Sequence, residues 1–239
     1  MEEAVESVIL LVVLVTFAVV AYAYVLPLSY AQLRGAEVRS AIGVMLTFAD
    51  QTVRLVEGDS TGPVDFAFPY GVFELSNNGN VSVLVNGVSL FNGTHQVVRY
   101  RTDISGYPNA YVADRGSSPT NAFFSTVDTA SLVYHYSRQG WSYVVSDMRV
   151  AVSSISVGGV AVLHILVTQI EPAQVSLKRG PVQLTLQNMT TATSTYDNGV
   201  DLTVTCGNDS NGSPLPPRSL QVSDQVQVAL EVVTLQLQF

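Results

Sequence analysis

The sequence is poor in charge and has almost no lysine. Only 13% of its 239 residues are charged, roughly half the share in ordinary soluble domains, and Lys178 is its one lysine. The 11 basic side chains are outnumbered by 19 acidic ones, which gives a formal net charge of −8. A nucleic-acid-binding surface requires clustered lysines and arginines. The composition therefore argues against nucleic acid as a partner.

Residues that carry chemistry are also few. A lone cysteine, Cys206, cannot form an intrachain disulfide and is expected to be a small buried apolar residue. The histidines lack the spacing of metal ligands and fall in strand-like sequence, which favours structural roles for His95, His135 and His164. The common zinc, nucleophile-elbow and P-loop motifs are absent. We therefore predict that the protein is not an enzyme and that it binds no metal or cofactor.

What the sequence does contain is a long apolar run near its N-terminus. After Glu2, Glu3 and Glu6, no charged residue occurs from residue 7 to residue 33. The centre of the run, residues 8–25 (VILLVVLVTFAVVAYAYV), is long enough to cross a bilayer as a helix, for which about 20 apolar residues are needed. The run is apolar on every helical face, so it must be buried in lipid or in protein.

Three interpretations of this run compete. A cleaved secretory signal has a basic start and a shorter apolar stretch, whereas this start is acidic and the stretch is long. A simple membrane anchor conflicts with the positive-inside rule, because Arg34 and Arg39 follow the span and would keep the C-terminal part in the cytoplasm. The third interpretation is a processed chain, whose basic leader has been removed and whose apolar helix leaves the lipid to pack against copies of itself.

The helical pattern continues beyond Pro27, which removes one backbone donor and is expected to kink the helix. Gly58 is a plausible C-cap, and residues 59–63 (DSTGP) indicate a break. A helix over residues 2–57 would be roughly 85 Å long, so its first half must protrude from any globular part. Its second half is amphipathic, with apolar positions at steps of three and four: Val38, Ala41, Ile42, Met45, Phe48, Ala49, Val53, Leu55 and Val56.

After residue 63 the pattern becomes strand-like. Asn86-Gly87 is a strong hairpin signal, Gly158-Gly159 and residues 197–199 mark further turns, and residues 208–217 mark a loop. Short strands with frequent turns predict an antiparallel β-sandwich, with Trp141 in its core. The predicted fold class is α+β, with a helix over residues 1–57, a linker over 58–63 and a β-sandwich domain over 64–239. The predicted strands are residues 80–85, 88–91, 95–101, 131–136, 141–145, 148–157, 160–170, 174–177, 182–187, 200–206 and 225–239.

The first quarter of the chain resembles the type IV pilin superfamily, particularly its archaeal members. The resembling segments are MEEAVE, VILLVVLVTFAVVAYAYVLPL and SYAQLRGAEVRSAIGVMLTFADQTVRLVEG. The resemblance implies that a prepilin peptidase removes a basic leader just before Met1. It also implies a precursor inserted in the cell membrane, a pilus assembly machinery, and an extracellular filament with helices inside and globular domains outside. The N-terminus lacks the glycine-rich opening of archaeal flagellins, which favours a pilin with a role in cell adhesion.

In this interpretation the chain polymerises with copies of itself through the apolar helix. The family often carries a glutamate in the first helical turn, and Glu6 is the candidate for it. A glutamate beside a buried helix bundle is costly unless it is paired, and a neighbour's α-amino group is the nearest cation. Glu2 and Glu3 are expected to interact only with the helix dipole. The predicted assembly residues are Glu6, Val8, Leu11, Val13, Phe17, Val20, Tyr24 and Pro27.

Five Asn-x-Ser/Thr sequons indicate a glycosylated surface, and glycans would solubilise a domain that carries little charge. Two of the sequons fall in the predicted loop and are the preferred acceptors. Two other functions remain open: a membrane-anchored surface domain that binds a ligand without polymerising, and an extracellular hydrolase on the same anchor. The predicted acceptor residues are Asn80, Asn92, Asn188, Asn208 and Asn211.

Overall fold

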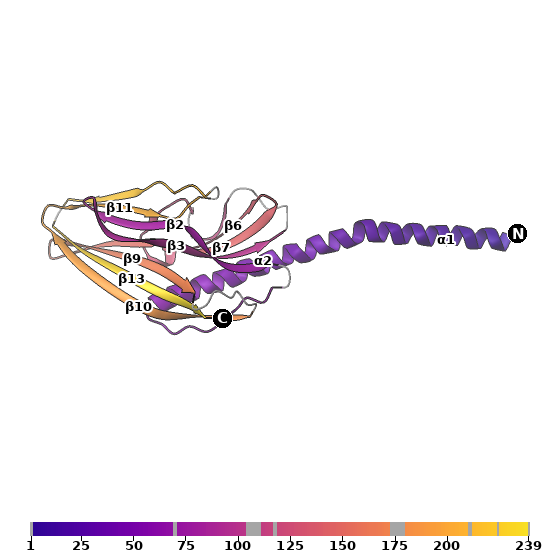
Figure 1. Ribbon diagram of the computed structural model, residues 1–239, viewed down its shortest axis with the longest axis horizontal. Coiled ribbons are helices and arrows are strands. Elements are labelled where there is room, and N and C mark those ends of the chain that lie inside the picture. The colour runs from indigo at the N-terminus through magenta and orange to yellow at the C-terminus, as the bar shows by residue number, and fades with distance from the viewer. Residues whose placement is uncertain are drawn as a thin grey trace.

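The computed structural model describes residues 2–68, 71–103, 111–116, 119–172, 180–209, 212–223 and 225–238. A helical rod projects from a β-rich part, with the N-terminus at the far end of the rod (Figure 1). The predicted α+β fold is confirmed, because one long N-terminal helix packs against two curled β-sheets. The predicted strand over residues 174–177 and the sequon at Asn211 lie outside the described residues.

The helix has three segments, which are α1 (Glu2–Val20), the π-helical turn η1 (Ala21–Val25) and α2 (Leu26–Val56). Pro27 lies in the first turn of α2, where its missing N–H is tolerated. The Leu26 N–H donates to the carbonyl of Ala21, five residues earlier. This wide turn relieves the clash that a proline ring makes with the carbonyl four residues before it. The helix therefore continues through Pro27.

The helix ends where the sequence predicts. Gly58 has a φ of +93°, a left-handed conformation that glycine adopts at the least cost. The Gly58 N–H donates to the Leu55 carbonyl at 3.2 Å, and the Asp59 N–H donates to the Arg54 carbonyl at 2.8 Å. These two bonds form a Schellman motif, which satisfies carbonyls of the last turn. The predicted C-cap is confirmed.

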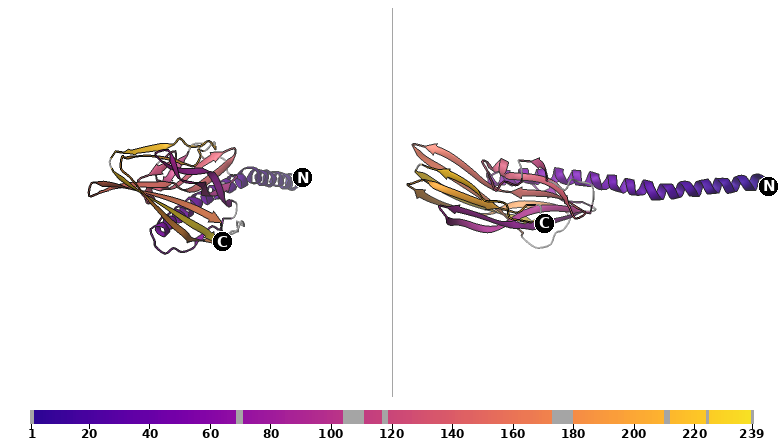
Figure 2. Two further views of the ribbon diagram at one scale, coloured as in Figure 1. Left: turned by 60° about the vertical axis from the view of Figure 1, so that its left-hand side comes forward. Right: turned by 90° about the horizontal axis from the view of Figure 1, so that it is seen from above.

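The two halves of the helix have opposite environments. Every side chain from residue 6 to residue 33 is exposed, and the first half stands clear of the sheets (Figure 1, Figure 2). The second half runs into the β-rich part, where Phe48 is 1% exposed and contacts Phe66 edge-on with 5.7 Å between ring centroids. The predicted amphipathic face is confirmed. Its buried members are Val38, Ala41, Met45, Phe48, Ala49, Val53 and Val56, and its half-buried members are Ile42 and Leu55.

The position of α2 affects how the chain divides into folding units. Because α2 contributes buried side chains to one of the two hydrophobic clusters between the sheets, a fragment that begins at residue 64 would leave the part of both sheets that lines this cluster uncovered. The division into residues 1–57 and 64–239 stays a prediction. From the packing we expect the folded unit to begin a few residues before Glu37, where the buried face of the helix starts.

The first sheet contains six strands in the order β1-β10-β13-β9-β8-β5. Most neighbouring pairs are antiparallel, but β13 runs parallel to β9 and β5 runs parallel to β8. The sheet is therefore mixed, which corrects the prediction of a wholly antiparallel sandwich. The chain leaves this sheet after β10, forms two strands of the other sheet, and returns as β13 between β10 and β9. The strand bounds are β1 Val64–Asp65, β5 Phe123–Phe124, β8 Val150–Val157, β9 Val160–Pro172, β10 Pro181–Tyr196 and β13 Val226–Gln238.

The second sheet contains seven antiparallel strands in the order β12-β11-β2-β3-β7-β6-β4. The turn at Asn86-Gly87, with φ values of 51° and 78°, joins β2 to β3 and confirms the predicted hairpin. The predicted strands over residues 88–91 and 95–101 are parts of one strand, β3. The bounds are β2 Val72–Val85, β3 Val88–Thr102, β4 Val112–Arg115, β6 Ser131–Arg138, β7 Trp141–Met148, β11 Val200–Cys206 and β12 Arg218–Val222.

Trp141 does not lie in the core, which corrects the prediction made for it. Its side chain is 39% exposed, and the guanidinium of Arg101 lies 4.9 Å from the centre of its ring. Strand alternation places Arg101 and Trp141 on the sheet face opposite to Tyr100, the residue that contacts the helix. A cation over an exposed indole is a favourable arrangement for both side chains.

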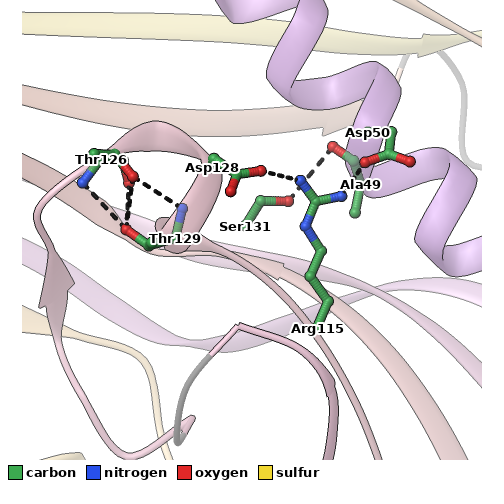
Figure 3. Close-up of polar contacts among 7 residues, drawn as sticks. All are labelled: Ala49, Asp50, Arg115, Thr126, Asp128, Thr129 and Ser131. Atoms are coloured by element: carbon green, nitrogen blue, oxygen red, sulfur yellow. Dashed lines mark hydrogen bonds and ion pairs between the residues drawn. The ribbon is translucent and has the colours of Figure 1, made fainter.

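Arg115, at the end of β4, ties the helix to the second sheet (Figure 3). Its guanidinium donates to Asp50 of α2 and, at 2.6 Å, to Asp128 of the short helix α3 (Val127–Ala130). Nearby, the Ser131 hydroxyl donates to the Ala49 carbonyl at 3.4 Å. Both aspartates are largely exposed, so each ion pair contributes about 1 kcal/mol or less. The bridge therefore orients α3 against the helix more than it stabilises the fold.

Candidate functional site: the apolar stem

The most unusual surface of the molecule is the projecting part of the helix, residues 6–33, here called the apolar stem. All eight predicted assembly residues lie on it and all are exposed. Among Val8, Leu11, Val13, Phe17, Val20 and Tyr24, the exposed fraction of the side chain ranges from 47% for Val20 to 73% for Tyr24. An all-round apolar helix leaves no face that water solvates well, and the structure shows these residues exposed; their role in assembly stays a prediction.

The stem cannot stay bare in water. Burying one Val, Leu or Phe side chain contributes about 1.5–3 kcal/mol, and the stem exposes many of them in one continuous surface. Its helix is the one, among the described residues, that is long and apolar enough to cross a membrane. The stem therefore requires either lipid or other apolar helices around it.

Glu37 fixes where the stem leaves the β-rich part, and sequence reasoning missed its role. Among the helix side chains that the structure describes, it is the first that is buried, and its Oε1 accepts a 3.2 Å hydrogen bond from the Gly71 N–H. Gly71 has no room for a side chain, since a Cβ there would lie 2.0 Å from the Tyr100 ring. This close approach allows the Tyr100 hydroxyl to reach the same glutamate oxygen. These two hydrogen bonds thus fix the position of the helix, along its own axis, relative to the second sheet.

A second group of reactive side chains lies inside the β-rich part and has the atom order of a catalytic triad. Sγ of Cys206 lies 3.5 Å from Nδ1 of His95, whose Nε2 lies 2.7 Å from Oδ1 of Asp147. The other oxygen of Asp147 accepts hydrogen bonds from the Tyr134 hydroxyl at 3.2 Å and from Nη2 of Arg149 at 2.8 Å. We call these five residues the buried polar cluster.

Opposite charges stabilise one another within this cluster. Burial alone would raise the pKa of Asp147, but Arg149 and His95 outweigh burial and lower that pKa to about 2. Burial alone would lower the pKa of His95, but Cys206 and Asp147 outweigh it and raise that pKa to about 9. Burial would likewise raise the pKa of the Cys206 thiol, and His95 and Arg149 lower it instead. Asp147 is therefore the anion that makes burial of the two cations tolerable.

The cluster is closed to solvent, with Cys206 1% exposed and Asp147 fully buried. Gly207 packs so tightly against it that a Cβ would lie 2.3 Å from Nη1 of Arg149. In this conformation a substrate cannot reach Sγ of Cys206, so the arrangement acts as a polar core. Burial of Cys206 confirms the prediction, whereas its contact with His95 was missed. The one sequence signal was a pair of opposite charges, Asp147 and Arg149, two residues apart in strand-like sequence.

The other two histidines also pair with carboxylates. Nδ1 of His135 lies 2.7 Å from Asp114, and Nε2 of His164 lies 2.9 Å from Glu231. Both pairs join neighbouring strands, β6 with β4 and β9 with β13. Across the described ranges, no three His, Cys, Asp or Glu side chains gather as metal ligands would.

The structure brings two of the sequons together. Asn80 on β2 lies opposite Thr94 on β3, and Ser82 lies opposite Asn92, so the two sequons are neighbours on one face of the sheet, where Asn80, Asn92 and Thr94 are exposed and Ser82 is half-buried. Asn188 is exposed on β10. The preferred acceptor Asn208 is only half-exposed and forms a bridge with Pro214. Glycosylation of these residues stays a prediction, with Asn80, Asn92 and Asn188 the more accessible acceptors.

Comparison of the chain with protein-family models, with curated proteins and with solved structures finds no match. The architecture, a long apolar N-terminal helix followed by a β-rich part, is consistent with a type IV pilin-like arrangement. Functional interpretation therefore rests on the stem and on how it is joined to the sheets.

Proposed function

We propose that the chain is the structural subunit of an extracellular, type IV pilus-like filament and polymerises through its apolar stem. The observation that carries this proposal is the change of environment along one helix. Residues 6–33 are exposed and, after Glu6, uncharged and mostly apolar, whereas the face that begins at Glu37 is buried in the β-rich part. Packing of stems against one another would bury the exposed half and place the β-rich parts outside.

The length of the stem supports polymerisation over simple anchoring. The uncharged run from residue 7 to residue 33 is roughly 40 Å long at ~1.5 Å per residue, whereas the hydrocarbon core of a bilayer is ~30 Å thick. The helix also enters the β-rich part without a flexible linker. A rigid join of this kind suits a subunit whose outer part must hold a fixed position around a helical core.

In this proposal the stem lies in the cell membrane before assembly, and a prepilin peptidase and an assembly machinery act on the precursor. The assembled filament is extracellular and its β-rich surface serves cell adhesion. The chain is a structural protein that requires no cofactor, metal or catalytic residue for this role. The buried polar cluster then contributes to folding of the outer part.

The test is a charge placed in the stem. Val13→Asp and Phe17→Asp should each abolish filaments, because an unpaired buried charge costs several kcal/mol in every subunit. Val88→Asp is the matched control, since Val88 is a comparably exposed valine in the hairpin between β2 and β3. We expect normal filaments from the control and unchanged circular dichroism from all three variants. Normal filaments from both stem variants would contradict the proposal.

A second candidate is a membrane-anchored surface domain that binds a ligand. The observation in its favour is an open polar pocket of about 560 Å³ formed by the β2–β3 turn, the start of β11 and the end of β12. An anchored domain would stay in the membrane fraction as single copies, and the wild-type chain would form no filaments. Val13→Asp would then reduce only the amount of protein retained in the membrane. The polar lining residues are Asn86, Asn198, Asp201, Gln221 and Ser223.

A further inference from the structure

The first sheet has two free edges, a long one on β10 and a shorter one on β8. β1 pairs with β10 only at Pro181 and Val182, and β5 pairs with β8 only at Val150 and Ala151. Within the described parts of the chain, no strand pairs with the outer side of β10 over residues 183–196 or of β8 over residues 152–157. The unpaired N–H and C=O groups of such an edge can template pairing with another strand.

Neither edge carries the usual protection against pairing. Residues 182–196 and 152–157 contain no charged residue and no proline, the residues that normally blunt a free edge. β10 has a bulge between Leu186 and Asn188, and beyond it pairs regularly with β13 up to Tyr196. Three of the exposed large apolar side chains of the β-rich part lie on these edges, namely Ile155, Leu186 and Met189.

The two edges also match in level and direction. Ser154 of β8 pairs with Leu163, Leu163 pairs with Val228, and Val228 pairs with Ser194 of β10. Ser154 and Ser194 therefore lie in one row across the sheet. β8 is antiparallel to β9, β9 is parallel to β13, and β13 is antiparallel to β10, so β8 and β10 run in the same direction. If a second copy is shifted within the plane of the sheet, perpendicular to its strands, its β8 comes to lie beside β10 of the first copy.

We propose that the free β10 edge of one copy pairs in parallel with the free β8 edge of a neighbouring copy, which continues the first sheet from subunit to subunit. This inference rests on the proposed function. The occupant is a second copy because every copy carries both edges, so the contact is head-to-tail and each copy can pair with one neighbour on either side. The chain has a net charge of −8, yet both edges are free of charge, so copies approach there without direct like-charge opposition.

The pairing is too small to act alone. β8 offers six free residues, far fewer than a stable interface of about 800 Å² per partner requires. Stems packed together would hold neighbouring β-rich parts at an effective concentration in the millimolar range, where a short strand pair forms. Edge pairing therefore follows stem packing and adds to it.

Cysteine cross-linking of the full-length chain tests this arrangement. Ser154→Cys is combined with Thr193→Cys, Ser194→Cys or Thr195→Cys in turn, so that a modest shift along the strands is covered, and a short bismaleimide is added to filaments. The native Cys206 is 1% exposed and stays unreactive. We expect a ladder of dimers, trimers and longer species from at least one double variant, and monomers from every single variant. The matched control joins Ser154→Cys with Ser89→Cys, because Ser89 is exposed on β3 of the second sheet, away from both edges, and should give no ladder.

The outcomes separate this inference from the proposed function. Filaments that form normally but give no ladder with any double variant overturn the edge pairing and leave stem-driven assembly standing. Dimers from Ser194→Cys alone indicate a two-fold contact between β10 strands and also overturn it. A chain that forms no filaments contradicts the proposed function. In that case the same reagent on chains in membrane vesicles decides the pairing, since a ladder supports it and monomers overturn it.

Discussion

The Tyr100 hydroxyl donates a 2.8 Å hydrogen bond to Oε1 of Glu37, and both side chains are buried where the helix enters the β-rich part. Burial and, next, the hydrogen bond to Glu37 raise the pKa of Tyr100, so the phenol stays protonated and keeps donating. This contact couples the exposed stem to the second sheet. It fixes the direction in which the stem projects.

Tyr100→Phe should therefore destabilise the protein. A buried carboxylate that loses a donor costs about 1–3 kcal/mol, so the free energy of unfolding of the full-length chain in detergent should fall by that amount. Tyr196→Phe on β10 removes a hydroxyl outside this contact and is expected to cost less than about 0.5 kcal/mol. Denaturant titration followed by near-ultraviolet circular dichroism measures both. If the two variants lose the same free energy of unfolding, the hydrogen bond from Tyr100 to Glu37 does not contribute the expected stability.

The helix should be indispensable for folding of the sheets. A fragment of residues 34–239 is expected to be soluble and to unfold cooperatively, whereas a fragment of residues 64–239 is expected to aggregate or stay unfolded. Each buried Val, Met or Phe of α2 contributes about 1.5–3 kcal/mol, and their sum is comparable with the whole stability of a domain, ~5–15 kcal/mol. Size-exclusion chromatography and thermal melts decide this. Cooperative melting of the shorter fragment would show that α2 is dispensable.

Asp147 should make stability depend on acid pH. Its pKa in the folded protein, about 2, lies below the ordinary value of 3.8. The stabilisation is therefore fully present above about pH 4 and is lost as the pH falls toward 2. Asp147→Asn lacks it at every pH and leaves Arg149 without its buried counter-charge, which costs about 3–5 kcal/mol near neutral pH.

The measurement for Asp147 is the difference in the free energy of unfolding between wild type and Asp147→Asn from pH 7 to pH 2. We expect this difference to shrink steadily below pH 4. Glu231→Gln is the control, because its partner His164 is more exposed and the pair contributes about 1 kcal/mol or less. A difference between wild type and Asp147→Asn that stays constant down to pH 2 would contradict the assignment.

Glu6 should matter more for assembly than the acids before it. If it pairs with a neighbour's α-amino group inside the stem bundle, Glu6→Gln leaves that amine buried without a partner, at a cost of about 3–5 kcal/mol. Glu2→Gln and Glu3→Gln should affect only the helix dipole, by about 0.3–1 kcal/mol each. Filament yield from the three variants at matched expression distinguishes these cases. Equal yields would leave apolar burial as the force that drives assembly.

The sequence by itself determined the features that depend on neighbouring residues. The apolar run defined the stem and its exposure, the three-and-four spacing defined the buried face of α2, and Gly58 defined where the helix ends. Asn86-Gly87 defined the first hairpin. The stem and the buried face follow from hydrophobic periodicity, and the helix end and the hairpin follow from backbone conformations that few residues adopt. Periodicity and backbone preference can both be read from a short stretch of chain.

The tertiary structure decided everything that depends on which strands meet. The return of β13 between β10 and β9 made the sheet mixed and left most of β10 without a partner on its outer side. The buried polar cluster draws His95, Tyr134, Asp147 and Cys206 from β3, β6, β7 and β11. Trp141 is exposed because of the sheet face on which its strand places it. The order of apolar and polar residues along the sequence shows which side chains prefer burial. The partner of a buried charge depends instead on pairing between strands far apart in the sequence, which no local signal encodes.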